Sequence, residues 1–353
     1  MTAAVKISSL YRRFGTTKKR RVVRALSLLL ITVFVSHSVV EQLWRPVAQP
    51  EYGVSFSADY ARELGVDWRA NFTALLDDLA IKNYRLMSYW DRIEPSAGRY
   101  VFDELDWQMD AVATRGGSVS LAIGLRQPRW PECRQPDWAA QLGENSGLWT
   151  AALNRYITAV VERYRDHPAL KSYQLENEAK NKWFGSCKGA APSDRLQQEF
   201  ELVKQLDDAH PVTMSLSDQH GLPLGQPIPD AYGFSVYRKV WNTQVPGLGF
   251  YLYYPTPLWY HRARKVLIER VKDRPIFIHE LQAEPWCPVA TKDCSIDEQN
   301  RSMSVEQLRA NIDFARKIGA ARIDLWGGEW WYWRKVHFGD ASVWEAVRSE
   351  LQS

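Results

Sequence analysis

From residue 52 onward the chain alternates between short apolar runs and longer stretches with helical periodicity. The short runs are rich in β-branched and aromatic residues, and eight of them are predicted strands: Tyr52–Ser57, Tyr84–Ser88, Ser118–Gly124, Leu170–Leu175, Pro211–Leu216, Ala231–Tyr237, Pro275–His279 and Arg322–Trp326. The longer stretches carry an apolar stripe, as at Phe72, Leu75, Leu76 and Leu79. This alternation predicts a parallel sheet whose strands are joined by helical crossovers.

The strand count favours a closed (β/α)8 barrel, a TIM barrel of the α/β class, over an open doubly wound sheet. The open sheet would have a Gly-rich phosphate loop after its first strand, where this chain reads SADY from Ser57 to Tyr60. Ser304 and Gln307 predict the start of the penultimate helix, and Gly319 predicts its end. Only the crossover from Ser217 to Asp230, which is rich in Gly and Pro, lacks a helical period.

The first 50 residues have a different character. Residues 1–24 hold eight Lys or Arg and no acid, and residues 25–40 are an apolar run broken by Ser36, His37 and Ser38. A basic leader before an apolar run predicts export, with the leader in the cytoplasm. A helix needs about 20 apolar residues to span a bilayer, and this run is slightly shorter. We favour an uncleaved membrane anchor, with a cleaved signal peptide as the alternative. Residues 41–50 are the predicted linker and residues 51–353 the predicted barrel domain.

Charge and cysteine content agree with an exported domain. The net charge is +4, but without the basic leader it becomes −4, so we expect no binding of nucleic acid by the folded part. All four cysteines, Cys133, Cys187, Cys287 and Cys294, follow the apolar run and would meet an oxidising compartment. We expect Cys287 to pair with Cys294, and Cys133 and Cys187 to lie on neighbouring loops; free buried thiols are the alternative. No Cys, His or Asp cluster has metal-binding spacing, so we expect no metal and no cofactor.

Two acidic residues stand where predicted strands stop, which is where a barrel of this kind has its active site. Glu178 follows the fourth strand in YQLENEAKN, and Glu280 follows the seventh in PIFIHELQAEPW. Strands four and seven lie across the barrel mouth, so the two carboxyl groups can face each other over a sugar, as retaining glycoside cleavage requires. Alternatively, Glu178 could cap the next loop and Glu280 could form a structural ion pair with Arg85.

From Tyr52 to Leu351 the chain resembles clan A of the glycoside hydrolases, retaining (β/α)8-barrel enzymes with an Asn-Glu pair after strand four and a Glu after strand seven. The resemblance implies that Asn177 binds the sugar 2-hydroxyl, Glu178 is the acid/base and Glu280 is the nucleophile. By the same resemblance Arg85 and Tyr237 support Glu280, and Trp326 forms the floor of the subsite. Some members have His two residues before the strand-six Tyr, where this chain has Ser235.

Further candidates lie on the predicted loops of the barrel mouth. Of the 16 tryptophans, those best placed to bind sugar are Trp90, Trp130, Trp183, Trp286 and Trp330, with Trp331 and Trp333 as weaker candidates; core packing is the alternative for each. Glu284 is a candidate substrate contact. Glu176 is expected to be structural, and His279 is expected to point away from Glu280 because side chains alternate along a strand.

Together these patterns predict a retaining glycoside hydrolase that cleaves O-glycosidic bonds of an oligosaccharide or polysaccharide outside the cytoplasmic membrane. It would be held there by its N-terminal segment, or secreted if that segment is cleaved. A transglycosylase with the same residues is one alternative. A membrane-anchored barrel that binds glycans without cleaving them is the other.

Overall fold

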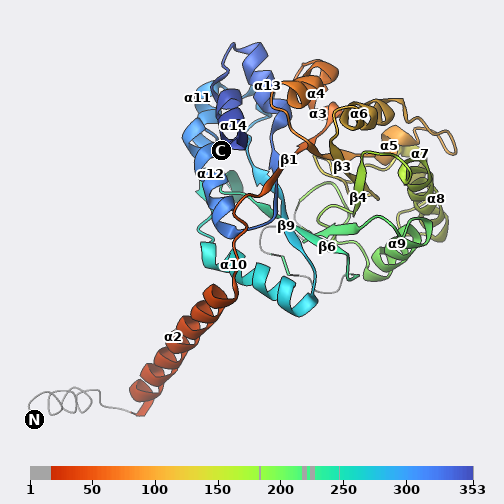
Figure 1. Ribbon diagram of the computed structural model, residues 1–353. Helices are drawn as coiled ribbons and strands as arrows, with labels where there is room; N and C mark the ends of the chain where they lie inside the picture. The colour runs from red at the N-terminus through yellow and green to blue at the C-terminus, as the bar shows by residue number, and fades with distance from the viewer. Residues whose placement is uncertain (1–16, 183, 217–220, 223–226, 246, 353) are drawn as a thin grey trace, which may run out of the picture.

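A computed structural model describes residues 17–182, 184–216, 221–222, 227–245 and 247–352. Eight parallel strands close into a barrel in the order β1-β10-β9-β6-β5-β4-β3-β2 (Figure 1). These strands are β1 (Glu51–Phe56), β2 (Asn83–Met87), β3 (Ser118–Ile123), β4 (Leu170–Leu175), β5 (Val212–Ser215), β6 (Ala231–Val236), β9 (Ile276–Gln282) and β10 (Arg322–Trp326). The predicted TIM barrel and all eight predicted strands are therefore confirmed.

Helices surround the barrel and bury their apolar stripes against it (Figure 1). Those that follow β1 are α3 (Ala58–Glu63), α4 (Trp68–Asp77), α5 (Trp90–Ile93), α6 (Asp103–Ala113), α7 (Asp137–Ala140), α8 (Gly147–Tyr164), α9 (Ser193–Leu206), α10 (Leu258–Leu267), α11 (Ile296–Ser302), α12 (Val305–Ile318), α13 (Gly328–His337) and α14 (Ser342–Gln352), with short turns η1 (Ile268–Lys272) and η2 (Thr291–Asp293). The predicted stripe of α4 is buried. Ser304 caps α12, and Gly319 ends it with a left-handed φ of 81°.

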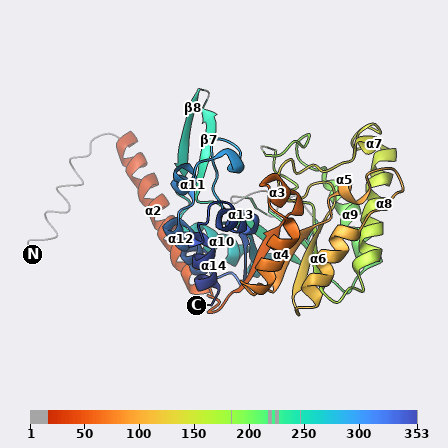
Figure 2. The same cartoon turned by 90° about the horizontal axis from the view of Figure 1, so that it is seen from above.

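One element was not expected from the sequence. Residues between β6 and β9 form an antiparallel hairpin of β7 (Lys239–Val245) and β8 (Leu248–Tyr253), which projects from the barrel (Figure 2). No helix lies among the described residues between β5 and β6, in accord with the weak pattern there.

Strand β9 contains an irregularity that matters for the site. Against β6 the register steps from Phe234 opposite Ile278 to Ser235 opposite Glu280, so His279 is the extra residue. The pairing of β9 with β10 is also shifted in this region. A bulge of this kind breaks the alternation of side chains along the strand. It also means that β9 continues through Glu280 to Gln282, beyond the predicted end at His279.

The N-terminal helix α2 (Thr17–Leu43) leaves the barrel on one side (Figure 1). Its stretch Arg21–Leu43 is long and apolar enough to cross a membrane, and none of it is buried. A signal sequence near the N-terminus can have the same length and apolar composition. Part of the predicted linker instead contacts the barrel: Glu41 forms an ion pair with Arg262 at 2.7 Å, and the indole of Trp44 donates to the Ile318 carbonyl at 2.8 Å. Most of the basic leader lies outside the described residues.

Both cysteine pairs are disulfide bonded. Cys133 and Cys187 link the loops after β3 and β4 with Cα atoms 5.3 Å apart, and Cys287 and Cys294 close a short loop after β9. The expected pairing of Cys287 with Cys294 and the expected proximity of the other two are confirmed. The bond between Cys133 and Cys187 joins two loops of the barrel mouth, so it restricts the positions of the residues in these loops.

Replacing Cys133 and Cys187 with Ala should destabilise the full-length chain more than replacing Cys287 and Cys294. The first pair is separated by 54 residues and the second by 7, and a longer closed loop restricts the unfolded chain more. Chain entropy alone gives losses of about 4 and about 2.5 kcal/mol. Thermal unfolding of the two double variants in detergent measures the difference, and equal melting temperatures would contradict it.

Candidate active site

Glu178 lies in the turn that follows β4, and this turn has an unusual backbone. Glu176 and Glu178 both have positive φ, 52° and 43°, which is uncommon outside glycine and is often found at functional sites. The carboxylate of Glu176 holds the turn because it accepts hydrogen bonds from the backbone N–H groups of Leu125 and Arg126 at 2.8 and 2.7 Å. Glu176 is thus a structural acid, as expected. The turn directs the Glu178 carboxyl toward the barrel mouth.

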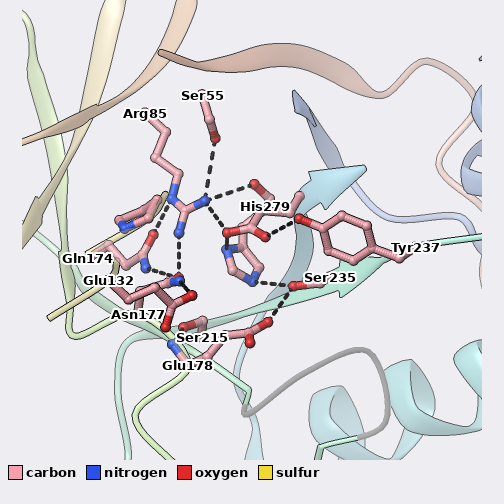
Figure 3. Close-up of polar contacts among 12 residues, drawn as sticks. Ser55, Arg85, Glu132, Gln174, Asn177, Glu178, Ser215, Ser235, Tyr237 and His279 are labelled. Atoms are coloured by element: carbon pink, nitrogen blue, oxygen red, sulfur yellow. Dashed lines mark hydrogen bonds and ion pairs between the residues drawn. The ribbon is translucent and has the colours of Figure 1, made fainter. Parts of the chain in front are cut away.

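The Glu178 carboxyl is buried and receives two hydrogen bonds. Ser235 Oγ donates to Oε1 at 2.8 Å (Figure 3). Asn181 Nδ2 donates to Oε2, also at 2.8 Å. Burial raises the pKa of Glu178 well above its usual range, and the negative charges of Glu280 and Glu132 raise it further. The two hydrogen bonds act in the opposite direction. Glu178 therefore retains its proton to higher pH than an exposed glutamate.

Glu280 has the opposite environment. Arg85 Nη1 donates to Oε1 at 2.7 Å, and the Tyr237 hydroxyl donates to Oε2 at 2.8 Å (Figure 3). Both the guanidinium charge and the hydroxyl hydrogen bond favour the carboxylate form. The pair of glutamates thus has one member surrounded by donors and one member whose ionisation is opposed by burial and by neighbouring charge.

Arg85 joins several of the predicted residues in one network (Figure 3). Besides Glu280, its guanidinium donates through Nη2 to Asn177 Oδ1 at 2.7 Å and through Nε to Gln174. Gln174 in turn donates to the same Asn177 oxygen at 3.2 Å. The side chain of Arg85 is 1% exposed, so these bonds form away from bulk water. The structure therefore brings Arg85, Asn177, Glu178, Glu280 and Tyr237 together, as the sequence predicted.

Sequence reasoning missed Glu132, a third buried carboxyl group in this site. It forms an ion pair with Arg126 at 2.8 Å, and its other oxygen accepts a hydrogen bond from Asn177 Nδ2 at 3.4 Å. Burial raises its pKa to about 7, although Arg126 lowers it. Its neighbour Cys133 is bonded to Cys187, and Cys133 and Trp130 were the residues by which the sequence drew attention to this loop.

His279 does not point away from Glu280, so that expectation is wrong. Because β9 bulges at this residue, the ring lies beside Glu280 and Ser235: Nδ1 is 3.7 Å from Glu280 Oε1, and Nε2 is 3.3 Å from Ser235 Oγ. The same Ser235 contacts Glu178. Sequence alternation alone could not reveal a bulge, which depends on pairing with both neighbouring strands.

The tryptophan candidates fall into two groups. Trp326 packs with Met87, Tyr89 and Tyr237 beside the glutamates. Trp286 lies edge-on to Tyr237 at 5.4 Å and contacts Phe184, which also contacts Trp130, 65% exposed. These side chains form an aromatic row from the glutamates to the surface. Trp183 lies outside the described residues.

The structure corrects the prediction for Trp90 and Trp330. Both are fully buried, and their indole N–H groups donate to Glu94 and Gln299, so they pack the core and cannot contact a sugar. The weaker candidates Trp331 and Trp333 are buried as well. These residues were expected on loops, but Trp90 begins α5 and the other three lie in α13, and their side chains face the core.

Glu284 belongs to a second charged group beside Trp326. It pairs with Arg129, which also pairs with Glu329 at 2.8 Å. The guanidinium of Arg129 lies 4.1 Å from the ring centre of Trp326. Burial raises the pKa of Glu284 to about 7 despite the lowering by Arg129. Glu284 also forms a hydrogen bond with the side chain of Trp326, a residue of the candidate subsite, while its ion pair with Arg129 holds it in place.

Comparison with known proteins finds similarity in sequence as well as in fold. A family model described as beta-galactosidase matches residues 70–215. Beta-galactosidase BgaB of Geobacillus sp. (strain Y412MC61) is 26% identical over 140 residues, which are 34% of this chain and 20% of that protein. A probable mannan endo-1,4-beta-mannosidase A-1 of Aspergillus terreus is 36% identical over 88 residues, 24% of this chain and 21% of that protein. The matched segments thus span about a fifth of these curated relatives.

Solved structures share the fold at low sequence identity. A GH5_18 E140A variant from Bifidobacterium longum, in complex with Manb1-4GlcNAc, has a TM-score of 0.56 at 13% identity, covering 79% of this chain and 69% of that one. Endo-glycoceramidase II from Rhodococcus sp., solved as a lactosyl-enzyme intermediate, has a TM-score of 0.53 at 15% identity, with coverage of 78% and 73%. In sequence this chain is thus similar to β-galactosidases and a mannosidase over part of its length, and in fold it is similar to glycosidase barrels.

Proposed function

We propose that this protein is a retaining glycoside hydrolase that cleaves O-glycosidic bonds of a glycan outside the cytoplasmic membrane. The observation that carries the proposal is the unequal environment of the two glutamates. Arg85 and Tyr237 both donate to Glu280, while burial and the charge of Glu280 keep the proton on Glu178. A nucleophile and an acid are the two roles that a double displacement requires.

In the first step Glu280 attacks the anomeric carbon while Glu178 gives its proton to the leaving oxygen. In the second step Glu178, now a carboxylate, removes a proton from water, which attacks the glycosyl-enzyme and releases Glu280. Esterification of Glu280 removes its negative charge, so the pKa of Glu178 falls when it must act as a base. Asn177, oriented by Arg85, is placed to bind the sugar beside the attacked carbon.

The aromatic row supports a carbohydrate substrate. Trp326 and Trp286 lie beside Tyr237, and a sugar ring can stack its apolar face on an indole while its hydroxyl groups reach polar neighbours. Phe184 and Trp130 continue the row outward and would contact the part of a longer glycan that leaves the site. Trp183 follows Lys182 in the same loop sequence and remains a candidate contact.

The location is inferred from helix α2 and the disulfides. Two disulfide bonds suit an oxidising compartment, and α2 has the length and hydropathy of a membrane span or a signal. We propose that α2 anchors the barrel to the outer side of the cytoplasmic membrane. The substrate would then be an oligosaccharide or polysaccharide within reach of that surface.

Trapping tests the nucleophile. Incubation with a 2-fluoro aryl glycoside, chosen by screening aryl glycosides for cleavage, should leave one fluoroglycosyl group on the peptide that contains Glu280. The E280Q variant should form no adduct and lose activity on the order of 10⁴-fold or more. The E345Q variant changes an exposed helix residue that pairs only with Arg348 and is the matched control. Mass spectrometry locates the label, and an adduct on another residue contradicts the assignment.

Replacing Glu178 tests the acid/base. The E178A variant should lose about 10²- to 10⁴-fold in turnover of substrates whose leaving group needs a proton, and much less in glycosylation by substrates that leave without one. Wild-type kcat/KM should fall as pH rises through the raised pKa of Glu178, because the acid form is then lost, and this alkaline limb should be absent from E178A. Azide should restore turnover of E178A as a glycosyl azide. An unchanged alkaline limb in E178A would assign the acid to another group.

A further inference from the structure

Two side chains that the proposed reaction does not use connect the two glutamates. Ser235 from β6 donates to Glu178 Oε1 at 2.8 Å, and its oxygen lies 3.3 Å from His279 Nε2. The other ring nitrogen, Nδ1, lies 3.7 Å from Glu280 Oε1 and has no hydrogen-bond partner although it is buried. Figure 3 shows His279 and Ser235 in line between Glu178 and the carboxylate that Tyr237 contacts.

The barrel is built to place this imidazole here. The bulge in β9 turns His279 to the same side as Glu280. On the neighbouring strand, Gly233 leaves the space that the ring fills: a Cβ at this position would lie 2.9 Å from His279 Cγ and Cδ2. Ser235, two residues further along β6, is 1% exposed and aims its hydroxyl between the ring and Glu178.

The charges around His279 keep it neutral. Burial lowers its pKa well below the usual value, and the cations Arg85 on β2 and Arg264 on α10 lower it further. The acids that face the connected groups are Glu178 and Glu280 themselves and Glu132 from the loop after β3, with the Tyr237 hydroxyl on Glu280. A neutral imidazole carries one N–H, on Nδ1 or on Nε2. A change in this environment therefore moves that hydrogen between the nitrogens without charging the ring.

The hydrogen bonds that link Glu178, Ser235 and His279 can be arranged in two ways. When Glu178 is ionised, the Ser235 hydroxyl donates to it, and the Ser235 oxygen can accept from Nε2–H of His279. When Glu178 is protonated, it can donate to Ser235, whose hydroxyl then donates to a bare Nε2, so that the imidazole hydrogen sits on Nδ1 and faces Glu280. A serine has one hydroxyl hydrogen, so the two arrangements exclude each other.

We infer that Ser235 and His279 form a proton relay that joins Glu178 to Glu280. This inference rests on the roles proposed for the two glutamates. The relay converts the unproductive state, with the proton on Glu280, into the productive one. Glu280 gives its proton to Nδ1, Nε2 gives its hydrogen to Ser235, and Ser235 gives its hydroxyl hydrogen to Glu178. Each intermediate group gains one hydrogen and loses one, so one proton moves from nucleophile to acid without passing through the site water.

The relay makes Ser235 and His279 positioning residues that act through the glutamates. In the free enzyme Arg85 and Tyr237 donate hydrogen bonds to Glu280, so the equilibrium of the relay favours the arrangement with the proton on Glu178. The 3.3 and 3.7 Å separations have to shorten for transfer, as hydrogen bonds at active sites often do when substrate binds.

The histidine tautomer tests the relay without any turnover. In full-length protein with ¹⁵N-labelled histidines, the His279 signals are those that are absent from H279Q. We expect the hydrogen on Nδ1 where Glu178 is protonated and on Nε2 where it is ionised, with the change following the titration of Glu178. The E178Q variant should show one tautomer throughout, and S235A should uncouple the tautomer from pH. A wild-type tautomer that stays constant as Glu178 titrates, or changes equally in E178Q, overturns the relay.

Kinetics provide a second readout, the pH dependence of kcat/KM for an aryl glycoside. The hydrogen bond from Ser235 lowers the pKa of Glu178, so S235A should shift the alkaline limb upward. The S235T variant retains the hydroxyl and should restore the limb. A limb that S235A leaves in place contradicts the relay. If the wild-type protein cleaves no aryl glycoside, the proposed function fails, whereas the tautomer measurement still decides the relay.

Discussion

The site depends on the guanidinium of Arg85, buried at the mouth of the barrel. It donates to Glu280, Asn177 and Gln174, so side chains from the region of β4 and from β9 are oriented by one group on β2. A buried cation is unfavourable unless its hydrogen bonds are made, and a buried carboxylate is unfavourable without such a partner. Arg85 and Glu280 are therefore each favourable in the buried site only because the other is present. Closure of the barrel, which brings β2, β4 and β9 around one mouth, is what allows them to meet.

This constraint separates two glutamates of identical chemistry. Glu280 is paired with the guanidinium of Arg85. Glu178 instead accepts hydrogen bonds from neutral donors, is buried, and is repelled by two nearby acids. Glu178 therefore retains its proton to higher pH, while Glu280 accepts hydrogen bonds from Arg85 and Tyr237. Glu132 adds to this difference, because its charge raises the pKa of Glu178 and its hydrogen bond helps to orient Asn177. Its loop is fixed by the bond between Cys133 and Cys187.

The sequence predicted what depends on periodicity and position. Eight strands, the position of Glu178 after β4 and the partners of Glu280 follow from alternating patterns and from the resemblance to clan A. It did not predict what depends on pairing between strands. His279 was misjudged because a bulge in β9 is set by β6 and β10. Trp90 and Trp330 were misjudged because they lie in helices α5 and α13, whose buried faces the sequence did not reveal. Glu132 carried no periodic signal at all.

The proposed pairing of a nucleophile with a protonated acid at the barrel mouth has a stereochemical consequence. A double displacement inverts the anomeric centre twice, so the first sugar released has the configuration of the substrate. Proton NMR of an aryl β-glycoside digest, recorded before mutarotation, measures that configuration directly. The account predicts that the β-anomer appears first and the α-anomer grows in only by mutarotation. An α-anomer formed first would mean that water attacks the sugar directly, and that Glu280 is not the nucleophile.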